Sequence, residues 1–341
     1  MTEKIDDFDI ARDPLWLAHR YDAVTDAFHF VEVSRDEQNF ALFLTDDYLP
    51  TNSRVRAIGR DTAVDAVRNS AQLHYIFHSA FCCSTLLARA LNQPGLAMSL
   101  KEPVILNDLV GWRRRGGTDA DVLRRLDAAL AMMARPFGQG ESVVIKPSNV
   151  GAAFFGAMLD LRTDSTAVLL YAPLRTYVGS IAKKGLWGRL WVRELFAGFR
   201  EDGLIGLGLN PADDIKLTDL QICAIGWLAQ HALFARLIER LGPTRVRSLE
   251  SETLIADPKR TLNELFKHFG WGADIHRVAE IVEGPEFHRH SKTDIPFSEY
   301  DRHREQIESA NIHADEIDKV IVWAETIAMQ NGIEMILPQA L

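Results

Sequence analysis

The sequence predicts a three-layer α/β protein, in which helices cover both faces of a mostly parallel, doubly wound sheet, with helical insertions. Short apolar runs typical of strands buried on both faces alternate with segments of helical spacing over most of the 341 residues. The clearest run is TAVLLY, residues 166–171, and similar runs lie at residues 75–77, 97–100 and 142–145. Strands that alternate with helices in this way are expected to pair in parallel.

The N-terminal part is predicted to extend this core with a β-hairpin. Residues 28–33 and 40–44 alternate apolar and polar side chains around a polar turn. Residues 61–71 have a capping aspartate and helical spacing, and they lead into the first core strand. We therefore expect three parts: an extension over residues 1–72, a core over residues 73–272, and a C-terminal loop with helices over residues 273–341.

Composition limits the class of partner. The formal net charge of −9 argues against broad, non-specific binding to nucleic acid or to an anionic membrane. No apolar stretch reaches the roughly 18 residues of a membrane span, and the acidic start MTEKIDDFDI lacks the apolar centre of a signal peptide. These features predict a cytoplasmic protein.

The three cysteines are too few for a disulfide framework or a four-cysteine zinc site. Cys82 and Cys83 are adjacent, and we expect them to serve as small residues near a ligand, with a redox role as the alternative. No metal is expected.

The most informative stretch is LHYIFHSAFCCSTLLARALN, residues 73–92. An apolar run gives way to small and polar residues, and Ser84 and Thr85 then open a segment of helical spacing, which predicts a strand, a tight loop and a helix. Backbone N–H groups at such a helix start suit a phosphate or sulfate. The alternative is an ordinary strand-to-helix turn whose hydroxyls only cap the helix.

The nucleotide-binding pattern G-x-x-x-x-G-K-S/T can be overlaid on this loop. His78 and Cys83 then fall on the glycines, Ser84 on the lysine and Thr85 on the hydroxyl position. Without the lysine the loop lacks the cation that bridges β- and γ-phosphates, so ATP-dependent chemistry is disfavoured.

At these residues the chain resembles the sulfotransferase family, whose phosphosulfate loop reads roughly K/R-S-G-T-T-L/W-L between a strand and a helix. Phe81 falls on the family's cation, Cys82 and Cys83 on its Ser-Gly pair, and Ser84 and Thr85 on its two hydroxyls. The resemblance implies a fold of the P-loop NTPase-like type.

Three further segments resemble the same family in the same order. KPSNV, from Lys146, resembles a K-x-P-x-H/N segment of bacterial members, and LLYAPLRTYVGSI resembles V-x-R-D/N-P-x-D/E-x-x-x-S. SETLIADPKRTLNELFKHFGW resembles Y-E-D-L-x-x-D/N-P followed by a helix ending in F-L-G. The likeness covers residues 73–271, and the family's arginine in the second of these segments falls on Tyr171.

The resemblance implies transfer of a sulfuryl group from 3′-phosphoadenosine 5′-phosphosulfate, as donor co-substrate, to a hydroxyl or amine of a small-molecule or carbohydrate acceptor. Glu102 is the first candidate for the base and His78 the second, while Lys101 or Lys146 would replace the missing loop cation. The implied donor-binding residues are Ser79, Phe81, Cys82, Cys83, Ser84, Thr85, Arg175, Ser180, Arg289 and Lys292, with His290 and Ser291 beside the last two.

Several alternatives stay open at this point. Glu102 also fits a structural partner of Lys101 or Lys146, and residues 286–304 also fit a solvated loop or, through His288 and His290, a metal site. The whole chain also fits an inactive nucleotide-binding or regulatory protein of the same fold, or another kind of phosphotransferase.

Overall fold

The computed structural model describes residues 6–67, 70–288 and 313–341. The chain folds into two compact units, which are described separately below. Unit 1 comprises the chain up to Ile76 together with Leu87–Thr166, and unit 2 comprises Phe77–Leu86 together with Ala167–Leu341.

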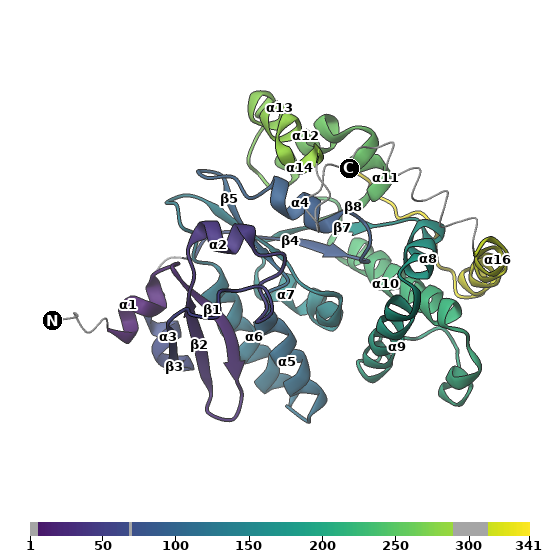
Figure 1. Cartoon of the computed structure of the whole chain (residues 1–341), viewed down its shortest axis with the longest axis horizontal. Helices are drawn as coiled ribbons and strands as arrows, with labels where there is room; N and C mark the ends of the chain where they lie inside the picture. Colours follow the sequence, from purple (N-terminus) through teal and green to yellow (C-terminus); the bar gives the residue numbers. More distant parts are fainter. Residues whose placement is uncertain (1–5, 68–69, 289–312) are drawn as a thin grey trace. The chain divides into compact units, whose positions relative to one another are not determined.

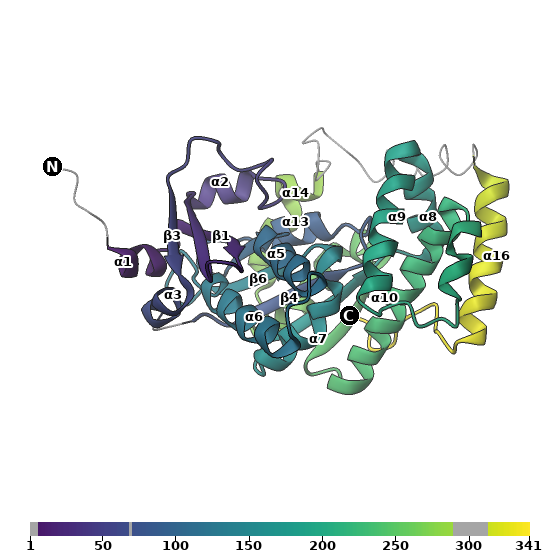
Figure 2. The same ribbon diagram turned by 90° about the horizontal axis from the view of Figure 1, so that it is seen from below.

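The main sheet has five strands. Figure 1 labels β4, β5, β7 and β8, and Figure 2 labels β6. They are β4 (Leu73–His78), β5 (Ala97–Lys101), β6 (Ser142–Lys146), β7 (Thr166–Tyr171) and β8 (Val246–Glu250). Their order is β5-β6-β4-β7-β8, and β5 with β6, β6 with β4 and β7 with β8 pair in parallel. The expected α/β fold with a parallel sheet is confirmed.

Every residue of β4 to β7 is buried, which explains why these strands read as continuous apolar runs. The strand of this sheet that comes first in the chain, β4, lies in the middle of the order, with β5 and β6 to one side and β7 and β8 to the other. The order therefore reverses at β4, and open α/β sheets bind their ligands where the strand order reverses, outside the carboxyl end of the strand.

Unit 1 contains a second, antiparallel sheet near the N-terminus. Its strands are β1 (Trp16–Asp22), β2 (Ala27–Glu32) and β3 (Val55–Gly59), paired in that order. The expected N-terminal hairpin is present, but β1 is its first strand and β2 its second. The predicted strand over residues 40–44 is wrong, because helix α2 (Arg35–Phe40) occupies the preceding residues and bends follow it. Ser34 and Glu37 form a capping box that starts this helix.

The remaining helices of unit 1 largely follow the expected segments. They are α1 (Asp7–Arg12), α3 (Arg60–Ala66), α5 (Val104–Arg114), α6 (Asp119–Met133), a 3₁₀ turn (Asn149–Phe154) and α7 (Phe155–Leu161). The Thr118 side chain accepts a hydrogen bond from the Asp121 backbone N–H and so caps α6. Helix α4 (Ser84–Ala90) starts in unit 2 and ends in unit 1.

Unit 2 is largely helical. Its helices are α8 (Leu174–Lys183), α9 (Gly185–Glu201), a 3₁₀ turn (Pro211–Lys216), α10 (Asp219–Leu241), α11 (Ser251–Ala256), α12 (Pro258–His268), α13 (Ile275–Glu283), α14 (Pro285–His288) and α16 (Ala314–Gln330). Helices α8, α9, α10 and α16 pack side by side, as Figure 2 shows. Within the described ranges, none of the helices is long and apolar enough to cross a bilayer.

Candidate functional site

The loop that follows β4 has an unusual backbone. Ala80, Phe81 and Cys83 have φ values of 66°, 50° and 64°, in the left-handed region that favours glycine. A residue with a Cβ atom costs roughly 1–2 kcal/mol in this conformation. Such strain persists only where the surrounding structure enforces it, and it concentrates at ligand sites. Cys83 is also the position where both sequence patterns have glycine.

Hydrogen bonds within unit 2 fix this loop on the end of β7. The Ser79 N–H donates to the Leu170 carbonyl oxygen at 3.0 Å, and the Ala172 N–H donates to the Ser79 hydroxyl oxygen at 3.2 Å. The buried Cys82 thiol donates to the same Leu170 oxygen at 3.4 Å. Ser79 and Cys82 therefore hold the loop, rather than presenting their side chains to solvent.

Three polar residues in and beside the loop are buried. His78, Ser84 and Thr85 are 2%, 6% and 4% exposed. The Ala80 N–H donates to His78 Nδ1 at 3.1 Å, so a neutral His78 carries its proton on Nε2. No hydrogen bond within the described part of the chain engages the side-chain hydroxyls of Ser84 and Thr85. Both hydroxyls are therefore available to donate to an anion.

Phe81, at the position of the family's cation, packs against aromatic rings. Its ring centroid lies 6.1 Å from that of Tyr177 on α8 and 5.7 Å from that of Trp191 on α9, both edge to face. Trp187 stacks on Trp191 at 6.4 Å. The Phe81 side chain therefore brings no positive charge to the loop, and only its backbone could contact an anion.

A second group of candidate residues lies in unit 1, at the ends of β5 and β6. The Lys146 ammonium forms an ion pair with Glu102 Oε1, and the Glu102 N–H donates to the Lys146 carbonyl oxygen at 2.6 Å. Glu102 has a φ of 51°, another left-handed residue with a side chain. The Lys146 side chain is 1% exposed and that of Glu102 is 21% exposed. The structure thus brings together Glu102 and Lys146 and leaves part of the Glu102 side chain open to solvent.

Residues of the N-terminal extension contact this group, which the sequence did not reveal. The buried Lys101 ammonium donates to the Asn39 carbonyl oxygen at 2.6 Å. The Lys146 ammonium lies 5.3 Å from the centre of the Phe43 ring. Asn39 and Phe43 are about sixty residues before Lys101 in the chain, and nothing in their local pattern signals the contact.

The residues expected to bind the donor's 3′-phosphate make contacts within the protein that differ from one residue to the next. Arg175 pairs with Asp318 at 2.7 Å, with both side chains more than half exposed. The Ser180 hydroxyl donates to the Thr176 carbonyl oxygen at 2.8 Å, within its own helix. The Tyr171 hydroxyl accepts from the Leu337 N–H at 3.4 Å, and burial raises its pKa to about 12. Arg289, His290, Ser291 and Lys292 lie outside the described residues.

The candidate residues are therefore distributed over the two units. The loop residues, His78, Arg175 and Ser180 belong to unit 2, whereas Lys101, Glu102 and Lys146 belong to unit 1. Each group follows the carboxyl end of a sheet strand, which is the edge where α/β sheets carry their chemistry.

Comparison with known proteins gives structural matches only. No family model and no curated protein matches the sequence. The chain is similar to the sulfotransferase domain of the curacin biosynthetic pathway, with 14% identity over 80% of this chain and 100% of that one and a TM-score of 0.44. It is also similar to the sulfotransferase domain of the Synechococcus PCC 7002 olefin synthase, with 14% identity over 72% and 96% of the chains and a TM-score of 0.38. A sulfotransferase from Alicyclobacillus acidocaldarius matches with 16% identity over 61% and 86% of the chains and a TM-score of 0.39.

Proposed function

We propose that this protein is a sulfotransferase, which moves a sulfuryl group from 3′-phosphoadenosine 5′-phosphosulfate to a hydroxyl or amine of an acceptor. The observation that carries the proposal is the loop after β4. Three of its residues have left-handed backbone conformations, and the hydroxyls of Ser84 and Thr85 are available to a ligand. The loop also follows β4, the strand at which the order of the sheet reverses. The four sequence segments that resemble sulfotransferases in order support the same function.

The loop residues would hold the anionic end of the donor. In this proposal the backbone N–H groups of residues 81–84 and the hydroxyls of Ser84 and Thr85 donate hydrogen bonds to donor oxygens. Sulfuryl transfer resembles phosphoryl transfer, in which positioning and neutralisation of charge on the leaving phosphate do most of the work. Adenosine 3′,5′-bisphosphate would leave as the second product.

Glu102 is the proposed base. As the acceptor oxygen forms its bond to sulfur, the bond from sulfur to the phosphate oxygen breaks and the hydroxyl proton passes to a base. A carboxylate in this role contributes about 10²- to 10⁴-fold to the rate. Lys146 keeps the Glu102 carboxylate in position through their ion pair, and the 21% exposure of Glu102 leaves it open to an acceptor. His78 is the second candidate base, through Nδ1 once the Ala80 bond is released.

Ligand binding tests the donor site directly. Adenosine 3′,5′-bisphosphate at 100 times its Kd should raise the free energy of unfolding by about 2.7 kcal/mol, and ATP should have no comparable effect. Thr85→Ala should weaken the binding of the bisphosphate in calorimetry. Full affinity in this variant, or preference for ATP, would contradict the proposed donor site.

A second candidate function rests on two substitutions in the sequence pattern of the family. Phe81 and Tyr171 stand where the family has cations, and both side chains are engaged within the protein. These residues fit a nucleotide-binding protein without transfer activity. Tight binding of adenosine 3′,5′-bisphosphate without transfer of ³⁵S-labelled sulfuryl groups to a panel of phenols, sugars and amines would favour this second function.

A further inference from the structure

Helix α9 in unit 2 has a buried side and an exposed side. It packs on α8 and α10, and its buried residues include Val192 and Phe199. The other side carries Leu186, Trp187 and Leu190, which are 72%, 60% and 52% exposed. Residues three and four apart share one face of a helix, so these three side chains form one apolar patch. An exposed patch of large apolar side chains marks a surface that binds a partner.

The largest side chain of this patch is held in place. The Trp187 ring stacks on the Trp191 ring, with 6.4 Å between their centroids and 10° between their planes. The Trp191 ring in turn meets the Phe81 ring edge to face at 5.7 Å. A ring that is already fixed loses little conformational entropy on binding, and tryptophan is among the residues that contribute most to protein interfaces.

Charges of opposite sign lie at the two ends of the patch. Lys183 and Lys184 come before it in the chain and Glu194 comes after it, and all three are exposed. Within residues 6–67, 70–288 and 313–341, neither Lys184 nor Glu194 forms an ion pair. Arg193, directly before Glu194, is already paired with Asp219. The exposed side of α9 is therefore positive at its start, apolar in its middle and negative beyond.

This order of charges is complementary to itself. Two copies of α9 that lie antiparallel about a twofold axis present the same surface to each other, with the start of each helix beside the later part of its partner. Lys184 and Glu194 lie five residues on either side of position 189. With the axis at this position, Lys184 of one copy comes opposite Glu194 of the second copy, and the apolar patches meet between these two ion pairs.

The same charges disfavour a membrane as the partner. Glu194 and Glu201 are both exposed, and their spacing of seven residues places them on the same side of the helix as the patch. Both carboxylates would face anionic headgroups, and the net charge of −9 adds to the repulsion.

We propose that this side of α9 is the interface of a homodimer, with Leu186, Trp187 and Leu190 at its centre and an ion pair between Lys184 and Glu194 of the second copy at each end. One helix from each copy buries a small area, so the dissociation constant lies in the micromolar range. The proposal does not depend on the proposed function.

Sedimentation velocity of the whole chain from about 1 to 100 µM tests the proposal, because this range covers the affinity expected of a small interface. The native protein should shift from one chain to two as its concentration rises. Trp187→Glu should weaken association about 100-fold or more, because a charge replaces the central ring in both copies. Val24→Glu is the matched control and should leave association unchanged, because Val24 is 90% exposed in the turn between β1 and β2.

Charge reversal tests the antiparallel arrangement separately. Lys184→Glu alone and Glu194→Lys alone each bring like charges together at both ends of the interface, and each should weaken association about ten-fold. An equimolar mixture of these two variants should associate as tightly as the native protein, because every pair across the axis is again of opposite sign. Circular dichroism checks that each variant is folded.

Three results would overturn the proposal. The first is a native protein that remains a single chain at about 100 µM, including one that binds anionic phospholipid vesicles instead. The second is a dimer that survives Trp187→Glu, because its interface then lies elsewhere. The third is a native dimer whose two charge variants do not associate more tightly in the mixture than alone, because Lys184 and Glu194 then do not meet across a twofold axis.

Discussion

Cys83 has a backbone conformation that its side chain opposes. Its φ of 64° lies in the left-handed region, where glycine avoids the clash of the Cβ atom with the backbone. We predict that Cys83→Gly raises the free energy of unfolding by about 1 kcal/mol, since relief of strain exceeds the added flexibility of the unfolded chain. Urea denaturation measures this change.

A neighbouring cysteine provides the control. Cys82 is fully buried, donates to Leu170, and is not among the described residues with positive φ. Cys82→Gly should therefore destabilise the protein. If both variants lower stability equally, the loop after β4 does not store the strain that the proposed donor site requires.

The ion pair of Glu102 and Lys146 links stability to the proposed chemistry. Glu102→Gln leaves the ammonium of Lys146, whose side chain is 1% exposed, without its carboxylate. Removing one partner of a buried pair costs about 3–5 kcal/mol, and the lower end is expected here because Glu102 is partly exposed. Replacing both residues, as in Glu102→Gln with Lys146→Met, should restore most of this stability. Chemical denaturation of the four proteins of this cycle measures the coupling.

The same cycle distinguishes the two roles of Glu102. If Glu102 is the base, turnover falls in Glu102→Gln and stays low in the double variant, although stability recovers. If the pair is only structural and neither Glu102 nor Lys146 takes part in the chemistry, turnover returns together with stability.

Part of the candidate site could be predicted from the residues alone. The pattern of Ser84 and Thr85 after a buried strand identified the loop, because strand, loop and helix are set by neighbouring residues. The charged pair before Pro103 made Glu102 a candidate, which stays a prediction. The contacts of Lys101 with Asn39 and of Lys146 with Phe43 could not be predicted, since they join segments that only the tertiary fold brings together.

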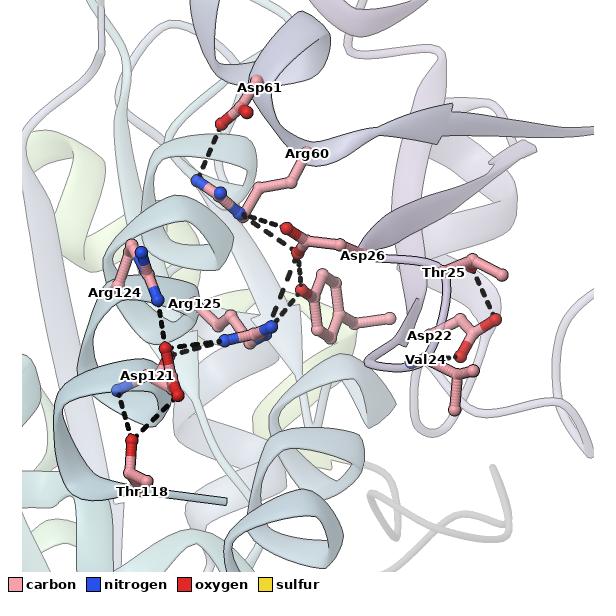
Figure 3. Close-up of polar contacts among 11 residues, drawn as sticks. Asp22, Val24, Thr25, Asp26, Arg60, Asp61, Thr118, Asp121, Arg124 and Arg125 are labelled. Carbon is pink, nitrogen blue, oxygen red and sulfur yellow. Dashed lines mark hydrogen bonds and ion pairs between the residues drawn. The ribbon is translucent and has the colours of Figure 1, made fainter.

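At the scale of elements, the hairpin of β1 and β2 is tied to helix α6 by a polar network, shown in Figure 3. The Tyr21 hydroxyl donates to Asp26 and accepts from Arg125 Nε at 2.8 Å, and Arg60 Nε donates to Asp26 at 3.1 Å. Burial and then the Asp26 carboxylate raise the pKa of Tyr21 to about 12. This hydroxyl therefore connects the strand, the turn and the helix.

We predict that Tyr21→Phe lowers the free energy of unfolding by about 1–3 kcal/mol, because two partly buried hydrogen bonds to charged groups are lost. Arg125 and Asp26, 3.8 Å apart, remain to offset each other's charge. Thermal unfolding followed by circular dichroism measures the loss. Tyr48→Phe, which removes an exposed hydroxyl, should leave the melting temperature unchanged, and an equal loss in both variants would refute the network's role.

Most elements of the core could be predicted because their signals are local. The run at residues 166–171 coincides with β7, and the cap at Thr118 coincides with the start of α6. The strand expected at residues 40–44 failed because alternation over five residues is a weak signal. The capping box of Ser34 and Glu37, which predicts a helix there, is the stronger one.

At the scale of the whole molecule, the two units are interleaved along the chain. The chain passes from one unit to the other within β4, within α4 and at the start of β7. The sequence carries no composition change or linker at these points, because each crossing lies in or beside a regular element rather than in a loop. A division into successive domains is the natural expectation from sequence, and such interleaving depends on long-range contacts.

Two buried histidines of unit 2 give the molecule a predicted pH dependence. Burial lowers the pKa of His231 to about 3 and that of His268 to about 4, and His231 stacks on Trp227 at 4.0 Å. Burial also lowers the pKa of His19 in unit 1. His231 and His268 are therefore held neutral in the folded protein at pH 5 and above, and they take up a proton more readily when the chain unfolds.

The direction of this pH dependence follows from the linkage between proton binding and folding. The unfolded pKa is 6.5, so the stabilisation is fully present above pH 6.5 and is lost as the pH falls toward the folded values. Between pH 6.5 and pH 5, His231 and His268 should each lower the free energy of unfolding by about 2 kcal/mol. The ion-paired carboxylates, such as Asp26 and Glu141, have lowered pKa values and lose their stabilisation only at more acidic pH.

Urea denaturation at pH 7 and pH 5 measures this slope. His231→Phe keeps an aromatic ring against Trp227 and removes the titrating group, so the difference in stability between the two pH values should shrink by about 2 kcal/mol. Adding a His268→Gln substitution should reduce the difference in stability between the two pH values by a similar amount. The comparison uses the slope rather than the absolute stability, so a general destabilisation by either substitution does not affect it. An unchanged slope in the double variant would mean that these histidines are already protonated in the folded protein at pH 5, against the burial seen around them.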